Sequence, residues 1–147
     1  MNQQLVDALN KQLANWNILY TKLHHYHWYV DGAHFFTLHE KFEEYYDEAA
    51  GYIDEIAERV LTIKGKPLSS LKAYLEVATI NEAEGKESDH EMVAQLAKDF
   101  QQIVNESNEI IEAAEEAQDQ PTSDLFIGIK ASLEKHIWML DAFNAKQ

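Results

Sequence analysis

Apolar residues recur every three or four positions along four long stretches of the chain, which is the spacing of one face of an α-helix. The first stretch covers residues 5–30 and stops at Gly32, where glycine can adopt the left-handed backbone that ends many helices. The second covers residues 35–63 and stops at Gly65 and Pro67. The first half of the chain therefore predicts two long helices joined by a short loop.

The second half repeats this pattern after a long connection. Residues 66–87 form the connection, and Ser70 is placed to cap a short helix within it. The third stretch opens with Ser88-Asp-His-Glu91, a capping box in which each end residue accepts a hydrogen bond from the backbone N–H of the other. Residues 119–123 predict a turn, and residues 125–143 predict a fourth long helix. One long crossover between two helix pairs predicts an all-α, ferritin-like four-helix bundle.

Composition supports a single ferritin-like domain over residues 1–147. Hydrophobic residues make up 46% of the chain, and only 5 glycines and 2 prolines interrupt it, which favours long helices. No run of about 18 apolar residues occurs, so no membrane partner is expected. The absence of cysteine excludes disulfides and thiolate metal sites. Because the first residues also lack a signal-peptide pattern, we expect a cytoplasmic protein.

The formal net charge is −14, and such a surface repels DNA phosphates and anionic lipid but attracts cations. Solubility alone explains many acidic chains, so the arrangement of the acids decides whether they form a site. On the second predicted helix, a helical wheel places a stripe of acids opposite the apolar face, at roughly 140° to 200° from Leu38: Glu43, Asp47, Asp54 and Glu58. An ordinary solvated helix shows the same stripe, so this feature leaves both interpretations open.

Two pairs of residues near this stripe are spaced to share a cation. His39 and Glu43 are four positions apart, and so are Asp54 and Glu58. About 16 Å of helix separates Glu43 from Asp54, so one metal cannot touch both pairs of a single chain. A two-fold axis across this helix would bring each pair to the other pair of a second copy and make two equivalent sites. Carboxylates with imidazole suit iron or manganese, and zinc as well.

The other histidines give weaker signals. His27 lies near the apolar stripe of the first helix, where a lone histidine is more often a core residue than a ligand. Four others have no carboxylate at a convincing spacing and are interpreted as structural or solvated: His24, His25, His34 and His136. A Glu-x-x-His match at residues 87–90 overlaps the capping box and is interpreted as chance. An internal site would need a second match, which is absent.

The chain resembles the Dps family, the dodecameric mini-ferritins, at several segments. Residues 27–32 (HWYVDG) and 38–43 (LHEKFE) resemble the family signature, and residues 53–59 (IDEIAER) resemble its second motif. Residues 136–139 (HIWM) resemble the last helix of Gram-positive members. The resemblance covers nearly the whole chain, and it implies a hollow shell of twelve copies.

The resemblance also implies a ferroxidase site that two subunits share. Its ligands would come from both: His27, His39 and Glu43 from one subunit, and Asp54 and Glu58 from its two-fold mate. Each site would take two iron ions, one of which can be tightly bound, and Trp28 beside it would take up oxidising equivalents. The implied reaction is oxidation of Fe(II), preferably by hydrogen peroxide and more slowly by oxygen, followed by storage of the ferric product.

Further residues are assigned by the resemblance, and three positions depart from it. Mineral nucleation would involve the acids of the second helix: Glu40, Glu44, Asp47 and Glu48. Iron would enter through three-fold pores near Glu115, Gln120 and Asp124. Glutamate at position 43 stands where many members have aspartate. Glutamine at position 120 stands where an acid is common, although Asp119 is adjacent, and Lys64 replaces an expected glycine, which we expect to be a loop detail only.

Strong direct binding to DNA is not expected, because family members that bind it tightly carry a Lys/Arg-rich tail and neither end of this chain does. Any protection of DNA would then be indirect, through removal of ferrous iron and peroxide. Three alternatives remain: a DNA-condensing or scaffold protein with little ferroxidase activity, a di-iron oxygenase or rubrerythrin-like reductase with an internal site, and an adhesive or lectin-like shell.

Overall fold

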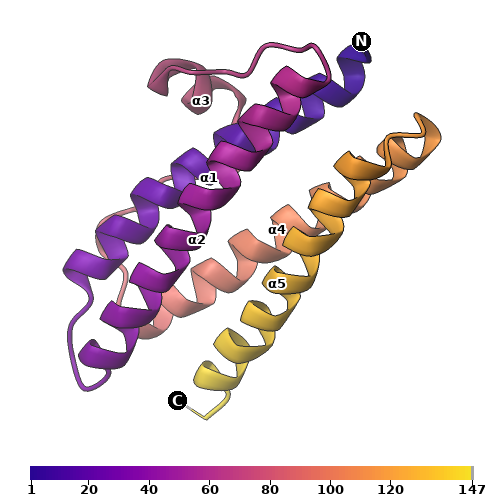
Figure 1. The fold of residues 1–147 in the computed structure, drawn as a ribbon. Helices are drawn as coiled ribbons and strands as arrows, with labels where there is room; N and C mark the ends of the chain where they lie inside the picture. The colour runs from indigo at the N-terminus through magenta and orange to yellow at the C-terminus, as the bar shows by residue number, and fades with distance from the viewer. Residues whose placement is uncertain (147) are drawn as a thin grey trace.

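Five α-helices and no strand make up residues 1–146, the part of the chain that this computed structural model describes. Their bounds are α1 (Gln3–Tyr29), α2 (Phe35–Thr62), α3 (Leu71–Val77), α4 (Asp89–Glu116) and α5 (Gln120–Asn144). The long helices form two antiparallel pairs, α1 with α2 and α4 with α5 (Figure 1). Within these residues, no helix is long and apolar enough to cross a bilayer. The predicted all-α, four-helix bundle is confirmed.

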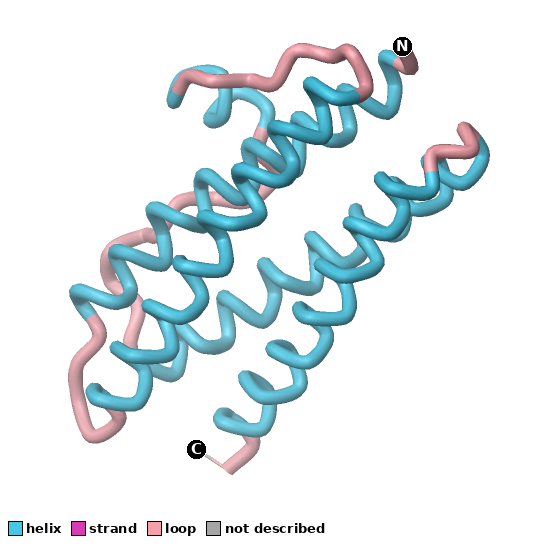
Figure 2. The backbone as a smooth tube through the Cα atoms, viewed as in Figure 1, coloured by secondary structure: helices cyan, strands magenta, loops and turns pink. Residues whose placement is uncertain are grey.

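The crossover runs back along the bundle from the end of α2 to the start of α4, with α3 near its beginning (Figure 2). Because of this crossover, α4 runs in the same direction as α2 (Figure 1). In a simple up-and-down bundle these two helices would run in opposite directions, so the connection is the ferritin-like one. The Ser70 side chain caps α3 by accepting a hydrogen bond from the Ala73 N–H at 3.2 Å. The capping box of Ser88 and Glu91 opens α4 as the sequence predicts.

The predicted turn at residues 119–123 is too long, because α5 begins at Gln120. Asp119 is the N-cap of α5, and its carboxylate accepts a hydrogen bond from the Thr122 N–H at 3.1 Å. Pro121 lies in the first turn, where the missing N–H costs nothing and the fixed φ favours a helix. The polar residues that suggest a loop are thus the start signal of the helix.

Apolar stripes from all four long helices meet in one core, and its largest fully buried side chains include Trp16, Tyr26, Phe42, Phe100 and Phe126. Gly32 has the expected left-handed backbone, with φ of +101°, but α1 already ends at Tyr29 with Val30 as its C-cap, so the glycine lies in the loop and does not end the helix. Lys64, where the family resemblance expects glycine, has φ of +73°. A residue with a Cβ is strained in this left-handed region by about 1 kcal/mol. Lys64 lies after the end of α2, so the change affects a loop position, as expected.

Candidate metal centre

His27 on α1 and His39 on α2 face each other across the seam between these helices, and each ring is fixed by the backbone of the other residue. His27 Nδ1 lies 2.6 Å from the His39 carbonyl oxygen, and His39 Nδ1 lies 2.7 Å from the His27 carbonyl oxygen. Since a carbonyl oxygen only accepts, each Nδ1 carries a proton and donates it. The two rings stack at a centroid distance of 3.7 Å. In each ring, Nε2 is therefore the nitrogen outside this backbone contact and the one that could bind a metal.

Glu43 adds a carboxylate to this imidazole pair. Its Oε1 atom lies 3.7 Å from His27 Nε2. The His27 side chain is only 8% exposed, whereas that of Glu43 is 52% exposed. Glu43 also follows His39 by one helical turn, which places both on the same face of α2. A buried nitrogen donor and an exposed anionic oxygen thus meet at the surface of the seam.

Asp54 and Glu58 are exposed on α2, and about 16 Å of helix separates Asp54 from Glu43. Within residues 1–146, no three histidine or acidic side chains of the single chain lie close enough together to hold a metal ion. His27 neighbours both His39 and Glu43, but these three side chains do not form a metal-binding group on their own, and Asp54 and Glu58 lie elsewhere on α2. This separation agrees with the predicted limit on a site within one subunit.

An aromatic wall lies next to the imidazole pair, and no pattern in the sequence indicates it. Tyr46 on α2 meets the His27 ring edge-on at a centroid distance of 5.4 Å. His24, interpreted from sequence as structural or solvated, stacks on Tyr46 at 3.9 Å. The predicted neighbour Trp28 contacts His24 at 5.3 Å and is 67% exposed. Tyr46, His24 and Trp28 thus form a series of aromatic contacts that begins at the His27 ring.

His136 on α5 has a carboxylate partner that no spacing within its own helix could indicate. Its Nε2 lies 2.8 Å from Glu48 Oε2 on α2. Ser132 donates to the other oxygen of Glu48 at 2.6 Å, and the Tyr52 hydroxyl donates to the same oxygen. Burial alone would raise the pKa of Glu48, but the hydrogen bonds from His136, Ser132 and Tyr52 lower it to about 2. Glu48, a nucleation candidate, is thus engaged in linking α2 to α5.

We expect Glu48→Gln to lower the free energy of unfolding by about 3 kcal/mol at pH 7. The pKa of Glu48 is lower in the folded protein than in the unfolded chain, so its stabilising effect is complete above pH 4.5 and is lost as the pH falls towards 2. The difference between wild type and variant should therefore shrink to about half by pH 3 in urea titrations. Glu55→Gln, an exposed control, should change stability at pH 7 by less than about 0.5 kcal/mol. A difference for Glu48→Gln that stays constant from pH 7 to 3 would contradict this account.

Arg59, the only arginine of the chain, ties α2 to the turn between α4 and α5. Its guanidinium donates to Asp119 Oδ1 at 2.7 Å and to Thr122 Oγ1 at 2.9 Å. Although burial opposes it, hydrogen bonds from Thr122 and Arg59 hold the pKa of Asp119 below its usual value. The Asp119 carboxylate is therefore paired with Arg59, and its side chain is mostly covered. The pore candidates Glu115, Gln120 and Asp124 are all exposed around this turn.

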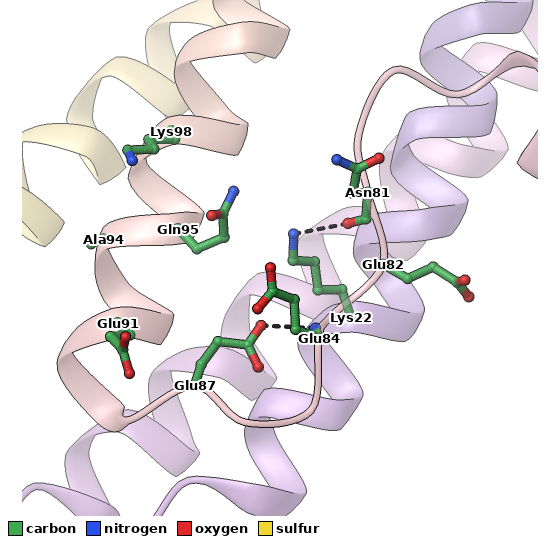
Figure 3. Close-up of a pocket in the computed structure, with 9 residues that line it drawn as sticks. All are labelled: Lys22, Asn81, Glu82, Glu84, Glu87, Glu91, Ala94, Gln95 and Lys98. Atoms are coloured by element: carbon green, nitrogen blue, oxygen red, sulfur yellow. Dashed lines mark hydrogen bonds between the residues drawn. The ribbon is translucent and has the colours of Figure 1, made fainter.

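A separate polar cavity of about 340 Å³ lies between the crossover, α1 and α4 (Figure 3). Lys22 Nζ contacts Asp99 Oδ2 at 2.7 Å and donates to the Asn81 carbonyl oxygen at 2.8 Å. The Glu87 carboxylate accepts hydrogen bonds from three backbone N–H groups of residues 84–86 and from the Tyr26 hydroxyl. None of the predicted metal ligands lines this cavity, and its contacts anchor the crossover. The Glu-x-x-His match at residues 87–90 is thus structural, as expected.

The remaining acids of the predicted set are at the surface. Glu40, Glu44 and Asp47 are exposed on α2, and Glu44 pairs with Lys41 at 2.8 Å. His25 stacks on Tyr29 at 4.6 Å. His34 packs edge-on against Phe143 at 5.1 Å. Both histidines therefore make aromatic contacts, in agreement with the structural interpretation.

Comparison with known proteins identifies the family. Residues 6–146 match the ferritin-like domain family. A protein from Bacillus anthracis named DNA protection during starvation protein 2 is 52% identical over 143 residues, which cover 97% of this chain and 98% of that protein. The chain belongs to the Dps family.

Solved Dps structures share the fold over nearly their whole length. The crystal structure of a Dps protein from Bacillus brevis superposes with a TM-score of 0.95 at 52% identity, covering 97% of this chain and 99% of that one. Dps from Staphylococcus aureus superposes with a TM-score of 0.97 at 44% identity, covering 99% and 98%. A Brevibacillus brevis relative named DNA protection during starvation protein is 55% identical over 142 residues. The resemblance to Gram-positive members of the Dps family is confirmed.

Proposed function

We propose that this protein oxidises ferrous iron, preferably with hydrogen peroxide, and stores the ferric product in a hollow shell. The observation that carries the proposal is the imidazole pair, in which reciprocal Nδ1–H bonds to backbone carbonyl oxygens fix the orientation of His27 and His39 beside Glu43. A ferrous ion needs such nitrogen donors together with carboxylates.

The second half of each site would come from a neighbouring subunit. Asp54 and Glu58 are exposed on α2, four positions apart, and face away from the core of their own subunit. An isologous two-fold contact through α2 would set these two acids opposite His39 and Glu43 of the partner and form two equivalent sites. The Dps protein from Vibrio cholerae is a member of a broad superfamily of ferritin-like diiron-carboxylate proteins, and carboxylates are likewise part of the donor set proposed for this chain.

The reaction would consume peroxide without releasing a radical. Two Fe(II) each give one electron to one H2O2, and with two protons the products are two Fe(III) and two H2O. The imidazole nitrogens would hold the substrate ions in place, and the carboxylates would offset the charge that rises from +2 to +3 on each ion. Because both electrons come from one site, the O–O bond is broken without a free hydroxyl radical.

Storage would take place inside a shell of twelve subunits. Exposed acids on α2 are the candidates for nucleating the ferric mineral: Glu40, Glu44 and Asp47, with Glu48 less available because of its pairing.

The relatives' names refer to DNA protection, and for this chain we propose that any such protection is indirect. A net charge of −14 opposes contact with phosphates, whereas removal of Fe(II) and peroxide prevents the damage at its source.

Anaerobic titration of metal-free protein with Fe(II), followed by hydrogen peroxide, tests the proposal. The absorbance of the ferric product should rise at a rate well above that in protein-free buffer, with about two irons oxidised per peroxide. A spin trap present during the reaction should detect little hydroxyl radical. Oxidation no faster than in buffer, or one iron per peroxide with radical release, would reject the ferroxidase function.

We expect Gln120→Glu to speed iron uptake about two- to fivefold at low ionic strength, because a negative charge at each pore steers cations inwards. The position is at the N-terminus of α5, where an acid is also favoured by the helix dipole, so the fold should tolerate the change. The gain should disappear at about 0.5 M salt, which screens exposed charges. Gln101→Glu on the exposed face of α4 is the matched control and should leave uptake unchanged. Equal acceleration by both variants would contradict a pore at this turn.

A further inference from the structure

Gly51 is exposed near the middle of α2, and its own subunit does not require a glycine there. Glycine destabilises the interior of a helix relative to alanine, because it loses more backbone freedom on folding. Among residues 1–146, no atom lies within 4 Å of the place that a Cβ would take, apart from the chain neighbours and the nearby α2 backbone. Ala50 beside it is also exposed. Contacts within the subunit therefore do not explain the missing side chain.

The two halves of the proposed metal site fix where a second copy would lie on α2. His39 and Glu43 face Glu58 and Asp54 of the second copy when a two-fold axis crosses α2 between positions 48 and 49. The two α2 helices then run antiparallel, and the acidic half of each meets the histidine half of the other. The exposed face of α2 is thus complementary to a second copy of itself.

The same register sets Gly51 of each copy opposite Tyr46 of the other. Both residues lie about 2.5 positions from the axis, or about 4 Å along the helix, on opposite sides of it. This close to the axis, their pairing changes little with the angle at which the helices cross. The Tyr46 ring is half-buried and held in place, because it stacks on His24 at 3.9 Å and meets His27 edge-on at 5.4 Å. A fixed ring on one copy thus faces a missing side chain on the other.

We propose that α2 packs against α2 of a second copy at this point, with Gly51 leaving room for Tyr46 of the other copy. The missing side chain lets the two helices approach closely, so that Asp54 and Glu58 come within reach of a metal ion at the imidazole pair. This inference rests on the proposed ferroxidase function and deepens it, since it names the contact that completes the shared site. A larger side chain at position 51 should therefore prevent both association and metal binding without unfolding the subunit.

Gly51→Leu tests the close approach in the full-length protein. Leucine is a good helix former and has room within the subunit, so circular dichroism should show a folded, helical protein. Two symmetric clashes should weaken association of two copies at least about 30-fold, measured by analytical ultracentrifugation over a dilution series. Binding of Co(II), a probe that needs no oxidant, is measured by calorimetry and should be lost in parallel. Wild-type association and Co(II) binding of Gly51→Leu would overturn the inference.

Tyr46→Ala shows whether the added side chain clashes with this ring in particular. In a double-mutant cycle, Gly51→Leu should weaken association less than about threefold when Tyr46→Ala is already present, because the leucine can occupy the space that the ring leaves. The association of the double variant is therefore compared with that of Tyr46→Ala alone. An equal loss in both backgrounds would contradict the pairing of Gly51 with Tyr46.

Gly128→Leu is the matched control, because Gly128 is also an exposed glycine within a helix, with no atom among residues 1–146 within 4 Å of an added Cβ beyond its chain neighbours and nearby helix backbone. It lies on α5, away from the proposed contact, so Co(II) binding should stay within about twofold of wild type. Equal loss of Co(II) binding in both leucine variants would also overturn the inference. Failure of the ferroxidase function would appear separately, as a wild-type protein that associates and binds Co(II) but does not accelerate Fe(II) oxidation by peroxide.

Discussion

Replacing Asp54 and Glu58 together by alanine should slow peroxide-driven Fe(II) oxidation at least about 100-fold and leave the subunit folded. Both side chains are exposed on α2 and take no part in the core of their own subunit. Their removal should therefore cost little stability, typically within about 0.5 kcal/mol per exposed site. A large loss of activity without a loss of fold separates a role as ligand from a role in packing.

The control removes the same number of charges elsewhere. Glu55→Ala/Glu82→Ala changes one exposed acid of α2 and one exposed acid of the crossover. We expect it to keep at least half of the wild-type rate, because it lowers the general attraction for cations only slightly. Shell size is checked by gel filtration with light scattering for both variants. If both pairs of substitutions slowed oxidation equally, the effect would belong to overall charge and not to a site.

His39→Ala should reduce the same rate about 100-fold or more, because it removes one of the two nitrogen donors of the proposed site. The remaining donor should stay in place. His27 Nδ1 donates to the backbone carbonyl of residue 39, and this oxygen is present whatever the side chain. The imidazole of His27 therefore keeps this hydrogen bond and its orientation, and the loss of rate reports the missing ligand.

His25→Ala provides the comparison, since this α1 histidine stacks on Tyr29 outside the imidazole pair. Its rate should remain within about twofold of wild type. Anaerobic Co(II) titration of both variants shows whether the rate follows metal binding. Full activity of His39→Ala, with Co(II) binding unchanged, would remove His39 from the site.

The long helices are predictable from the sequence because helical periodicity is a local signal. Four apolar stripes predict the four long helices, and side-chain caps at Ser70 and Ser88 predict the starts of two elements. The predicted start of α5 is five residues too late, because Asp119 and Pro121 occur both in turns and in first helical turns. The spacing of acids on α2 also indicates that one subunit cannot complete a metal site, which agrees with their positions in the fold.

Contacts between helices are not predictable in the same way, because they depend on how each helix is rotated about its own axis when two apolar faces pack together. His136 and Glu48 are 88 positions apart, and Arg59 and Asp119 are 60 apart. The reciprocal hydrogen bonds of His27 and His39 form only when the backbone of each helix lies within hydrogen-bond distance of the other residue's imidazole. No pattern within one helix carries that information. The position of Tyr46 beside the imidazole pair is hidden in the sequence for the same reason.

Complementation between two inactive variants tests the shared site most directly. One variant carries His39→Ala/Glu43→Ala and the other Asp54→Ala/Glu58→Ala, and the two are co-expressed with different tags so that mixed shells can be purified. In a mixed two-fold pair, the intact histidine half of one subunit meets the intact acids of the other. Random pairing at equal amounts should therefore restore about a quarter of the wild-type sites, and with them about a quarter of the rate. Mixed shells no more active than either variant alone would contradict a site built from two subunits.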